Sequence, residues 1–97
     1  MQVRFEPEAE AEMLEIMGWY EAQMPVLRSR FMQAVDAVVS TLSRAPYAYA
    51  ESYPGVRRAN LRHFPYCFFY SVGVHEVKVL ACMHQHRDLA TWPSLDH

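Results

Sequence analysis

The sequence predicts an α+β domain with the element order β-α-α-β-β-β, in which a helical hairpin packs on one face of a small, mainly antiparallel sheet. Apolar residues recur with a helical period between residues 7 and 44, and they alternate with the period of a strand between residues 56 and 83. Helices and strands segregated along the chain in this way are typical of α+β folds. Because 52% of the 97 residues are apolar, residues 1–97 can form one domain around a single core.

Two helices are predicted after a short strand at residues 2–5. Pro7 favours the first turn of a helix, and the glutamates that follow it oppose the positive end of the helix dipole. This helix is expected to end near Ala22, because Gln23-Met24-Pro25 interrupts the pattern. Pro25 can then begin a second helix, whose apolar stripe continues to the segment Ser43-Arg44-Ala45-Pro46. A connection this short makes the two helices antiparallel neighbours.

Three strands are predicted at residues 56–61, 66–72 and 77–83, after a tyrosine-rich connection that ends in the turn signal Pro54-Gly55. A turn centred on Val74 and His75 would make the last two strands an uninterrupted antiparallel hairpin. In that register the side chains facing the helices are Tyr66, Phe68, Tyr70, Val72, Val77, Val79, Ala81 and Met83. The opposite face would be open, with Cys67 opposite Cys82 and with the cationic side chains of Arg58, Arg62, Lys78 and His84.

The charges of the chain divide by sign between its two halves. Residues 1–54 contain four arginines and eight carboxylates, so their net charge is −4. Residues 56–88 contain five cationic side chains and two carboxylates, so their net charge is +3. The net charge of −2 for the whole chain hides this asymmetry. A cationic region at the ends of a predicted hairpin indicates an anionic or acidic partner.

The sequence also limits the class of protein. The N-terminal segment is too acidic for a secretory signal and no apolar run approaches the length of a membrane span, so a cytoplasmic location without membrane association is expected. Cys67 and Cys82 form neither a C-x-x-C pair nor a zinc-binding pattern, and they are expected to stay reduced. The sequence contains no phosphate-binding loop, nucleophile triad or metal-binding cluster, and no cofactor or metal is expected.

Six short segments occur in an order that carries a family resemblance. They are Phe5-x-Pro7-Glu8-Ala9-Glu10, Trp19-Tyr20-Glu21, Arg57-Arg58, Phe64-Pro65-Tyr66 with Tyr70, Val79-Leu80-Ala81, and His84-x-His86-Arg87-Asp88 with Trp92. With these segments the chain resembles the ParE/RelE superfamily of bacterial toxins over nearly its whole length. The resemblance implies a RelE/ParE-like βααβββ fold. It also implies a toxin of a type II toxin–antitoxin module, which a cognate antitoxin neutralises by direct binding.

The resemblance implies two alternative activities. ParE-like members inhibit DNA gyrase by protein contact without chemistry of their own, whereas RelE-like members are ribosome-dependent mRNA endonucleases. A nuclease needs concentrated positive charge. This chain has one lysine, Lys78, a net charge of −2, and no tyrosine after Tyr70, where such nucleases often carry a catalytic one. Growth arrest through DNA gyrase is therefore favoured, and an inactive member that serves only as a binding module is the third alternative.

The cationic residues of the second half are the candidates for contact with the target. For a gyrase inhibitor they are Arg57, Arg58, Arg62, Lys78 and Arg87. For a nuclease the catalytic candidates are Arg58, Arg62, His84, His86 and Arg87, with an imidazole as general acid or base. Structural roles compete with these assignments, because charge on an edge strand discourages aggregation and Arg87 can pair with Asp88. The aromatic residues Trp19, Tyr20 and Trp92 are expected to pack in the core.

The antitoxin is expected to bind the helical hairpin. Methionine adapts to a partner's side chains, and the apolar stripes of the two helices are wider than the sheet needs. The antitoxin would lie as a helix, a strand or both in a groove between the hairpin and the sheet, in a hetero-oligomer. Its candidate contacts are Met13, Met17, Met24, Met32 and Val39, and the alternative is that they only fill a methionine-rich core.

Overall fold

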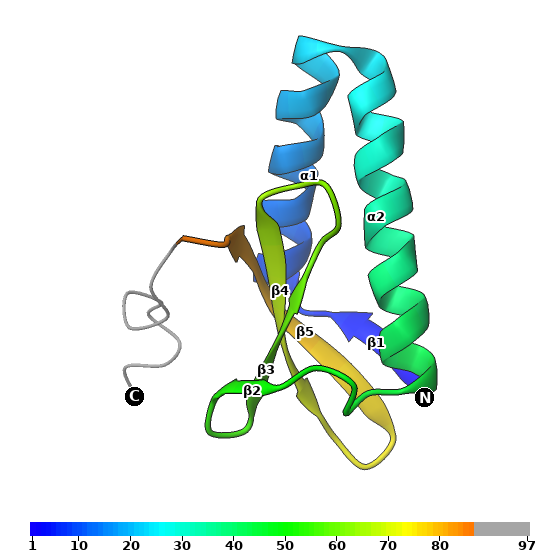
Figure 1. Ribbon diagram of the computed structural model, residues 1–97, viewed down its shortest axis with the longest axis vertical. Coiled ribbons are helices and arrows are strands. Elements are labelled where there is room, and N and C mark those ends of the chain that lie inside the picture. Colours follow the sequence, from blue (N-terminus) through cyan, green and yellow to red (C-terminus); the bar gives the residue numbers. More distant parts are fainter. Residues whose placement is uncertain (87–97) are drawn as a thin grey trace.

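The computed structural model describes residues 1–86, which fold into a five-stranded sheet and a helical hairpin (Figure 1). The elements are β1 (Gln2–Phe5), α1 (Pro7–Gln23), α2 (Pro25–Arg44), β2 (Glu51–Tyr53), β3 (Val56–Asn60), β4 (Tyr66–Val72) and β5 (Glu76–His84). The strands lie in the order β1-β5-β4-β3-β2. Because β1 pairs with β5 in parallel and the other neighbours are antiparallel, the sheet is mixed. The predicted α+β class is confirmed.

A single residue, Met24, connects the two helices of the hairpin. Met24 has extended backbone angles, ends α1 and precedes α2. Its N–H donates to the Tyr20 carbonyl at 2.9 Å, and its own carbonyl accepts from the Leu27 N–H at 2.9 Å. Pro25 suits the next position because the first turn of a helix needs no backbone donor. The two predicted helices are confirmed, and α1 is one residue longer than expected. Within residues 1–86, neither helix is long and apolar enough to cross a membrane.

The main core lies between the hairpin and one face of the sheet. Its fully buried members include Phe31 and Leu42 from α2, and Phe68 and Tyr70 from β4. At the hairpin end, an aromatic group formed by Tyr20, Phe31 and Phe64 closes the core. The ring centroid of Phe64 lies 5.1 Å from that of Tyr20 and 5.3 Å from that of Phe31. These edge-on contacts are favourable aromatic geometries. Tyr20 packs against the core as expected.

The β4–β5 hairpin departs from the predicted register at one residue. Near the turn the pairing agrees with the prediction, since Tyr70 lies opposite Val79, but Phe69 lies opposite Ala81. Leu80 is therefore an extra residue in β5, which makes a β-bulge. Because side chains alternate between the two faces of a strand, each residue of β5 after the bulge faces the side opposite to the predicted one.

Because of the bulge, several residues face the side of the sheet opposite to the predicted one. Cys82 joins the core under the helices, whereas Ala81 and Met83 join a second buried cluster on the far face of the sheet. Cys67 lies opposite Met83, so the prediction that the two cysteines face each other is wrong. Both thiols are free and buried. The far face is not open as expected, because its cluster is buried and consists of Val56, Cys67, Phe69, Ala81 and Met83, with Leu80 packed against it.

The tyrosine-rich connection contains a strand that the sequence did not reveal. The three residues of β2 pair with the start of β3 through a turn at Pro54 and Gly55. Gly55 has a φ of 78°, a left-handed conformation that glycine adopts without strain. Its N–H donates to Glu51 Oε2 at 2.7 Å, so the side chain of Glu51 closes the turn. The strand is too short and too exposed to produce an alternating pattern.

Candidate functional site

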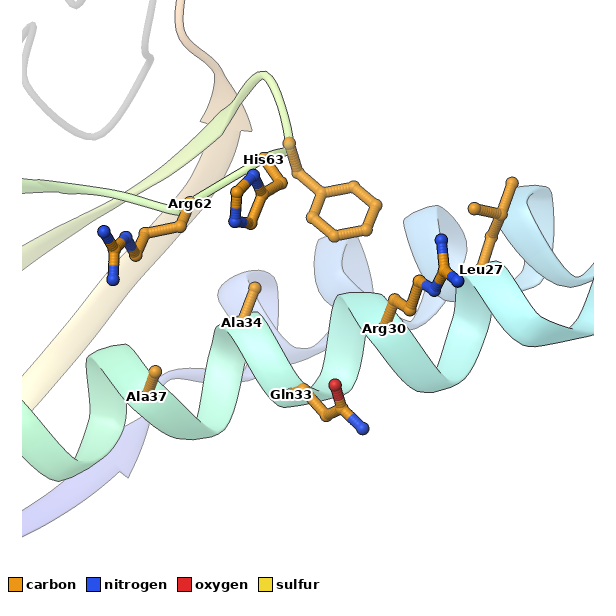
Figure 2. A pocket seen from close by; sticks show the side chains of 8 residues that line it. Leu27, Arg30, Gln33, Ala34, Ala37, Arg62 and His63 are labelled. Carbon is orange, nitrogen blue, oxygen red and sulfur yellow. The ribbon is translucent and has the colours of Figure 1, made fainter.

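A groove between α2 and the β3–β4 loop collects cationic side chains (Figure 2). The groove, called the α2 groove below, has a volume of about 610 Å³. In this view Arg62 and His63 lie above α2, and Arg30 extends from the helix near Leu27, away from Arg62. Ala34 and Ala37 share the helix face of Arg30, at spacings of four and seven residues, and their small side chains leave the space. The remaining lining residues are Leu27, Gln33 and Phe64.

The β3–β4 loop is held at both ends and projects its middle residues. Leu61 is buried and its N–H donates to the Tyr66 carbonyl at 2.9 Å. Phe64 is anchored in the aromatic group, so Arg62 and His63 stand exposed between two fixed side chains. His63 has a φ of 69°, which is unfavourable for a residue other than glycine and is often found at functional sites. The fold thus holds these two side chains over α2.

The cations of the α2 groove are available to a partner. Neither Arg30 nor Arg62 forms a hydrogen bond or ion pair with another residue within the range 1–86. Both side chains belong to exposed residues. Each guanidinium group can therefore donate hydrogen bonds to a carboxylate or a phosphate of a partner. Arg62 was predicted from the sequence, whereas Arg30 was missed because it lies in the acidic first half of the chain.

Arg57 holds the tyrosine-rich connection against the sheet. Because it lies opposite Tyr70, its side chain extends toward the helix side. Its Nη1 donates to the Tyr49 carbonyl at 2.6 Å, and its guanidinium lies 4.9 Å from the Tyr47 ring centroid. The hydroxyl of Tyr70 also holds this connection, because it donates to the Pro46 carbonyl at 2.7 Å. Burial raises the pKa of that hydroxyl. Arg57 is therefore engaged within the protein.

Arg58 points to the opposite face and is engaged there. Its Nε donates to Asn60 Oδ1 at 3.0 Å, and its Nη2 donates to the Gln85 carbonyl at 2.8 Å. The guanidinium lies 5.9 Å from the centroid of the Phe69 ring, so it crosses the buried cluster of the far face. Its proximity to Cys67 lowers the pKa of that thiol, but burial has the larger effect and raises it overall. Lys78 lies opposite Ser71, nearer the hairpin turn.

The two histidines lie beyond the bulge, at the end of β5. The ring centroid of His84 lies 5.6 Å from that of Tyr66 and 5.2 Å from that of His86. The backbone N–H of His86 donates to His84 Nδ1 at 3.2 Å. His84 thus lies beside α1 and does not join the cationic face, which corrects the expected placement. Arg87, Asp88 and Trp92 lie outside the described residues.

The nuclease candidates are consequently divided among three places. Arg62 lies over α2, Arg58 crosses the far face of the sheet, and His84 lies beside α1. Arg58 reaches the backbone between the two histidines, but it comes from the other face and is already hydrogen-bonded. Within residues 1–86 there is also no group of carboxylates, histidines and cysteines that could hold a metal ion.

A second hollow, called the α1 pocket below, lies between α1 and the end of the β4–β5 hairpin. It has a volume of about 410 Å³ and is lined by Glu12, Glu15, Ile16, Trp19, Tyr66, Cys82, Met83 and His84. Trp19 is 58% exposed at its mouth, so the prediction that this ring packs in the core is wrong. The sequence signal for the pocket is the spacing of Glu12, Glu15 and Trp19, which places them on one helix face.

Glu12 ties the α1 pocket to the sheet. Its Oε1 accepts the backbone N–H of Cys82 at 3.0 Å. Burial, with a further contribution from the Glu12 carboxylate, raises the pKa of the Cys82 thiol to about 12. The thiol is therefore protonated and unreactive at neutral pH.

The residues predicted to bind an antitoxin differ in exposure. Met17 is buried in the main core. Met13, Met32 and Val39 are partly buried and pack against that core, whereas Met24 is 53% exposed at the tip of the hairpin. Exposed Val26 and Trp19 also lie on the hairpin, so its outer end carries apolar surface.

Comparisons with known proteins agree with the fold and identify a family. The family model described as the ParE toxin of the type II toxin–antitoxin system parDE matches residues 3–89. The solved structure titled "Chromosomal ParDE TA system from P. aeruginosa" is similar with a TM-score of 0.74 at 22% identity, over 87% of this chain and 95% of the other. Among curated proteins, none matches the chain. Since the family model spans most of its length, the chain belongs to the ParE family of toxins of type II toxin–antitoxin systems.

Proposed function

We propose that the chain arrests bacterial growth by inhibiting DNA gyrase, and that it acts by protein contact rather than by cutting RNA. The observation that carries this proposal is the division of the nuclease candidates among three places. General acid–base chemistry requires its groups within hydrogen-bonding reach of one substrate. Arg62, Arg58 and His84 lie on different sides of the sheet and hairpin, and Arg58 is occupied by internal hydrogen bonds.

The RelE-like endonuclease is the alternative activity, and an inactive binding module is the third. The pair of histidines favours the endonuclease, because their rings lie 5.2 Å apart and His84 is exposed. The charge argues against it, because the chain carries a net charge of −2 and α1 places Glu12 and Glu15 beside His84. Gyrase and mRNA are both intracellular, so either activity takes place in the cytoplasm.

The α2 groove is the proposed contact with the target. Arg30 and Arg62 are exposed and unpaired within the described chain, whereas Arg57 and Arg58 are held by internal contacts. Among the predicted target contacts, Arg62 therefore takes the leading place. Arg57 is engaged with the tyrosine-rich connection, and Arg58 and Lys78 lie outside the groove. Arg87 stays a prediction.

The cognate antitoxin is proposed to cover the apolar end of the hairpin. Met24 is the most exposed of the five predicted residues, and Met13, Met32 and Val39 are accessible at the edge of the core. Met17 is proposed to act through its packing with these residues. The resulting complex is a hetero-oligomer.

Induction of the chain alone in a bacterial host tests the proposed activity. Gyrase inhibition predicts filamentation with an induced DNA-damage response, and purified chain should block supercoiling by purified gyrase. Rapid translation arrest with cleaved mRNA would instead support the endonuclease, and normal growth would support the inactive module. His84→Ala and His86→Ala should leave gyrase inhibition unchanged, whereas a nuclease that uses either imidazole would lose roughly 100-fold or more in rate.

Arginine variants test the α2 groove within the same assay. Arg62→Ala and Arg30→Ala should each abolish growth inhibition without lowering the thermal midpoint, because both side chains are exposed and unpaired within residues 1–86. Arg44→Ala is the matched control, since Arg44 lies on the same helix outside the groove. Full toxicity of both groove variants would contradict the proposed contact.

A further inference from the structure

The α1 pocket carries negative charge that the protein does not neutralise. Helix α1 contains five glutamates and no lysine or arginine. Glu21 pairs with Arg28 at 3.4 Å, and Glu12 accepts the Cys82 N–H, but Glu15 has no hydrogen bond or ion pair within residues 1–86. The opposite wall carries the exposed ring of His84. Two carboxylates therefore line the pocket, and only that of Glu12 accepts a hydrogen bond from a residue in the range 1–86.

Trp19 adds an aromatic surface to this charge. The indole is 58% exposed and makes an edge-on contact with Tyr20, at 5.2 Å between ring centroids. Tyr20 is itself fixed in the aromatic group beneath the hairpin, so it supports the position of Trp19. Tryptophan next to carboxylates is a favourable site for a guanidinium or ammonium group, which gains ion pairing and a cation–π contact together.

An open strand edge lies next to the pocket. β1 pairs with β5 only as far as Val79, and within residues 1–86 no strand continues along that edge toward His84. In an antiparallel ladder alternate residues direct their backbone groups away from the neighbour. The Cys82 N–H is such a group, because it donates to the Glu12 carboxylate in the place where the carbonyl of a further strand would lie. An extended segment can pair with an edge of this kind.

We propose that the α1 pocket binds an arginine or lysine side chain of the cognate antitoxin, presented by an extended segment that lies along the open edge of β5. The inference rests on the proposed antitoxin partnership and adds the chemistry of one contact to it. The cationic side chain lies between Glu15 and Trp19. The backbone beside it uses the edge of β5 at exposed His84, because the N–H of Cys82 already donates to Glu12. The acidic α1 pocket thus selects a basic residue, while the cationic α2 groove on the other helix stays free for an acidic or phosphate group.

The test measures affinity between the purified chain and the antitoxin encoded beside it. Glu15→Gln removes the charge and keeps the shape, and Trp19→Ala removes the ring. Each should weaken binding by about 5- to 30-fold, the range that a partly desolvated cation–π or charged contact supplies. Added salt should weaken binding of the native chain more than that of Glu15→Gln, because the variant has lost the ion pair.

Two controls lie on the same helix outside the pocket. Leu14 is 53% exposed, and Glu10 is an exposed carboxylate of the first turn. Leu14→Ala and Glu10→Gln should keep native affinity, and all variants should keep the native thermal midpoint. Equal losses for Leu14→Ala and Trp19→Ala, or unchanged affinity in both pocket variants, would overturn the pocket assignment alone. Failure of the native chain to bind the antitoxin would contradict the partnership itself.

Discussion

The two faces of the central sheet are both buried, but they are covered by different means. The helix face holds Phe68 and Tyr70 under a complete helical hairpin, in the larger of the two apolar clusters. The far face holds Phe69 in a smaller cluster, over which the guanidinium of Arg58 extends to the Gln85 carbonyl. Consecutive arginines at the start of β3 thus serve opposite faces. A cationic strand residue can therefore belong to the structure of a sheet face as well as to its partner surface.

Substitution of the two neighbouring phenylalanines should show the difference between the faces most strongly. Phe68→Ala should lower the free energy of unfolding by about 3–5 kcal/mol, because it opens a cavity under both helices. Phe69→Ala should cost about 3 kcal/mol, the lower end of that range, since the smaller far cluster can collapse further around the missing ring. Denaturant unfolding measures both values. Equal losses would mean that the far face is packed as tightly as the helix face.

Substitution of the three arginines should separate structural cations from available ones. Arg57→Ala and Arg58→Ala should each destabilise the fold by about 1.5–3 kcal/mol, because each loses charged hydrogen bonds to backbone carbonyls. Arg62→Ala should change stability by about 0.5 kcal/mol or less, as for an exposed surface residue. Thermal midpoints of the three variants provide the measurement. A midpoint for Arg58→Ala equal to that of the native chain would return this residue to the target contacts.

The last effect appears only at high pH and concerns Cys82. Burial raises the pKa of its thiol from 9.0 to about 12, so the folded protein keeps the thiol protonated while the unfolded chain ionises. Its contribution to stability is therefore complete below about pH 9 and is lost as the pH rises toward about 12. Cys82→Ala should lose less stability over this interval than the native chain does. Parallel pH profiles would show that the thiol is accessible, as would its rapid reaction with a thiol reagent at pH 8.

Much of the fold follows from local signals in the sequence. Pro7 and Pro25 mark the beginnings of both helices, and the helical period of α2 identifies the face that carries Phe31, Val35, Val38 and Leu42. The strands near the hairpin turn also follow from their alternation. In contrast, the β-bulge at Leu80 depends on tertiary packing and has no local signature, so the register beyond it was wrong. The parallel pairing of β1 likewise depends on residues far apart in the chain.

The candidate site was only partly predictable for a related reason. Arg62 could be identified because it lies in a predicted loop of the cationic half. Arg30 could not, because its importance comes from Ala34 and Ala37, whose small side chains leave space beside it. Glu12 and Glu15 had the helical signature of a solvated face, and only the end of β5 turns that face into a pocket. Trp19 is exposed although its ring is apolar, and a periodic pattern cannot predict that exposure.

The parallel contact between β1 and β5 has a consequence for the order in which the chain folds. Gln2 lies opposite Glu76, so the first strand pairs with the last across most of the sequence. The hairpin of α1 and α2 can form from local contacts, but β5 supplies the neighbour of both β1 and β4. Formation of this long-range pair is slow relative to local helix formation. A growing chain therefore exposes β1 and the sheet side of the hairpin until β5 has been synthesised, and the completed toxin surface forms in the last step of folding.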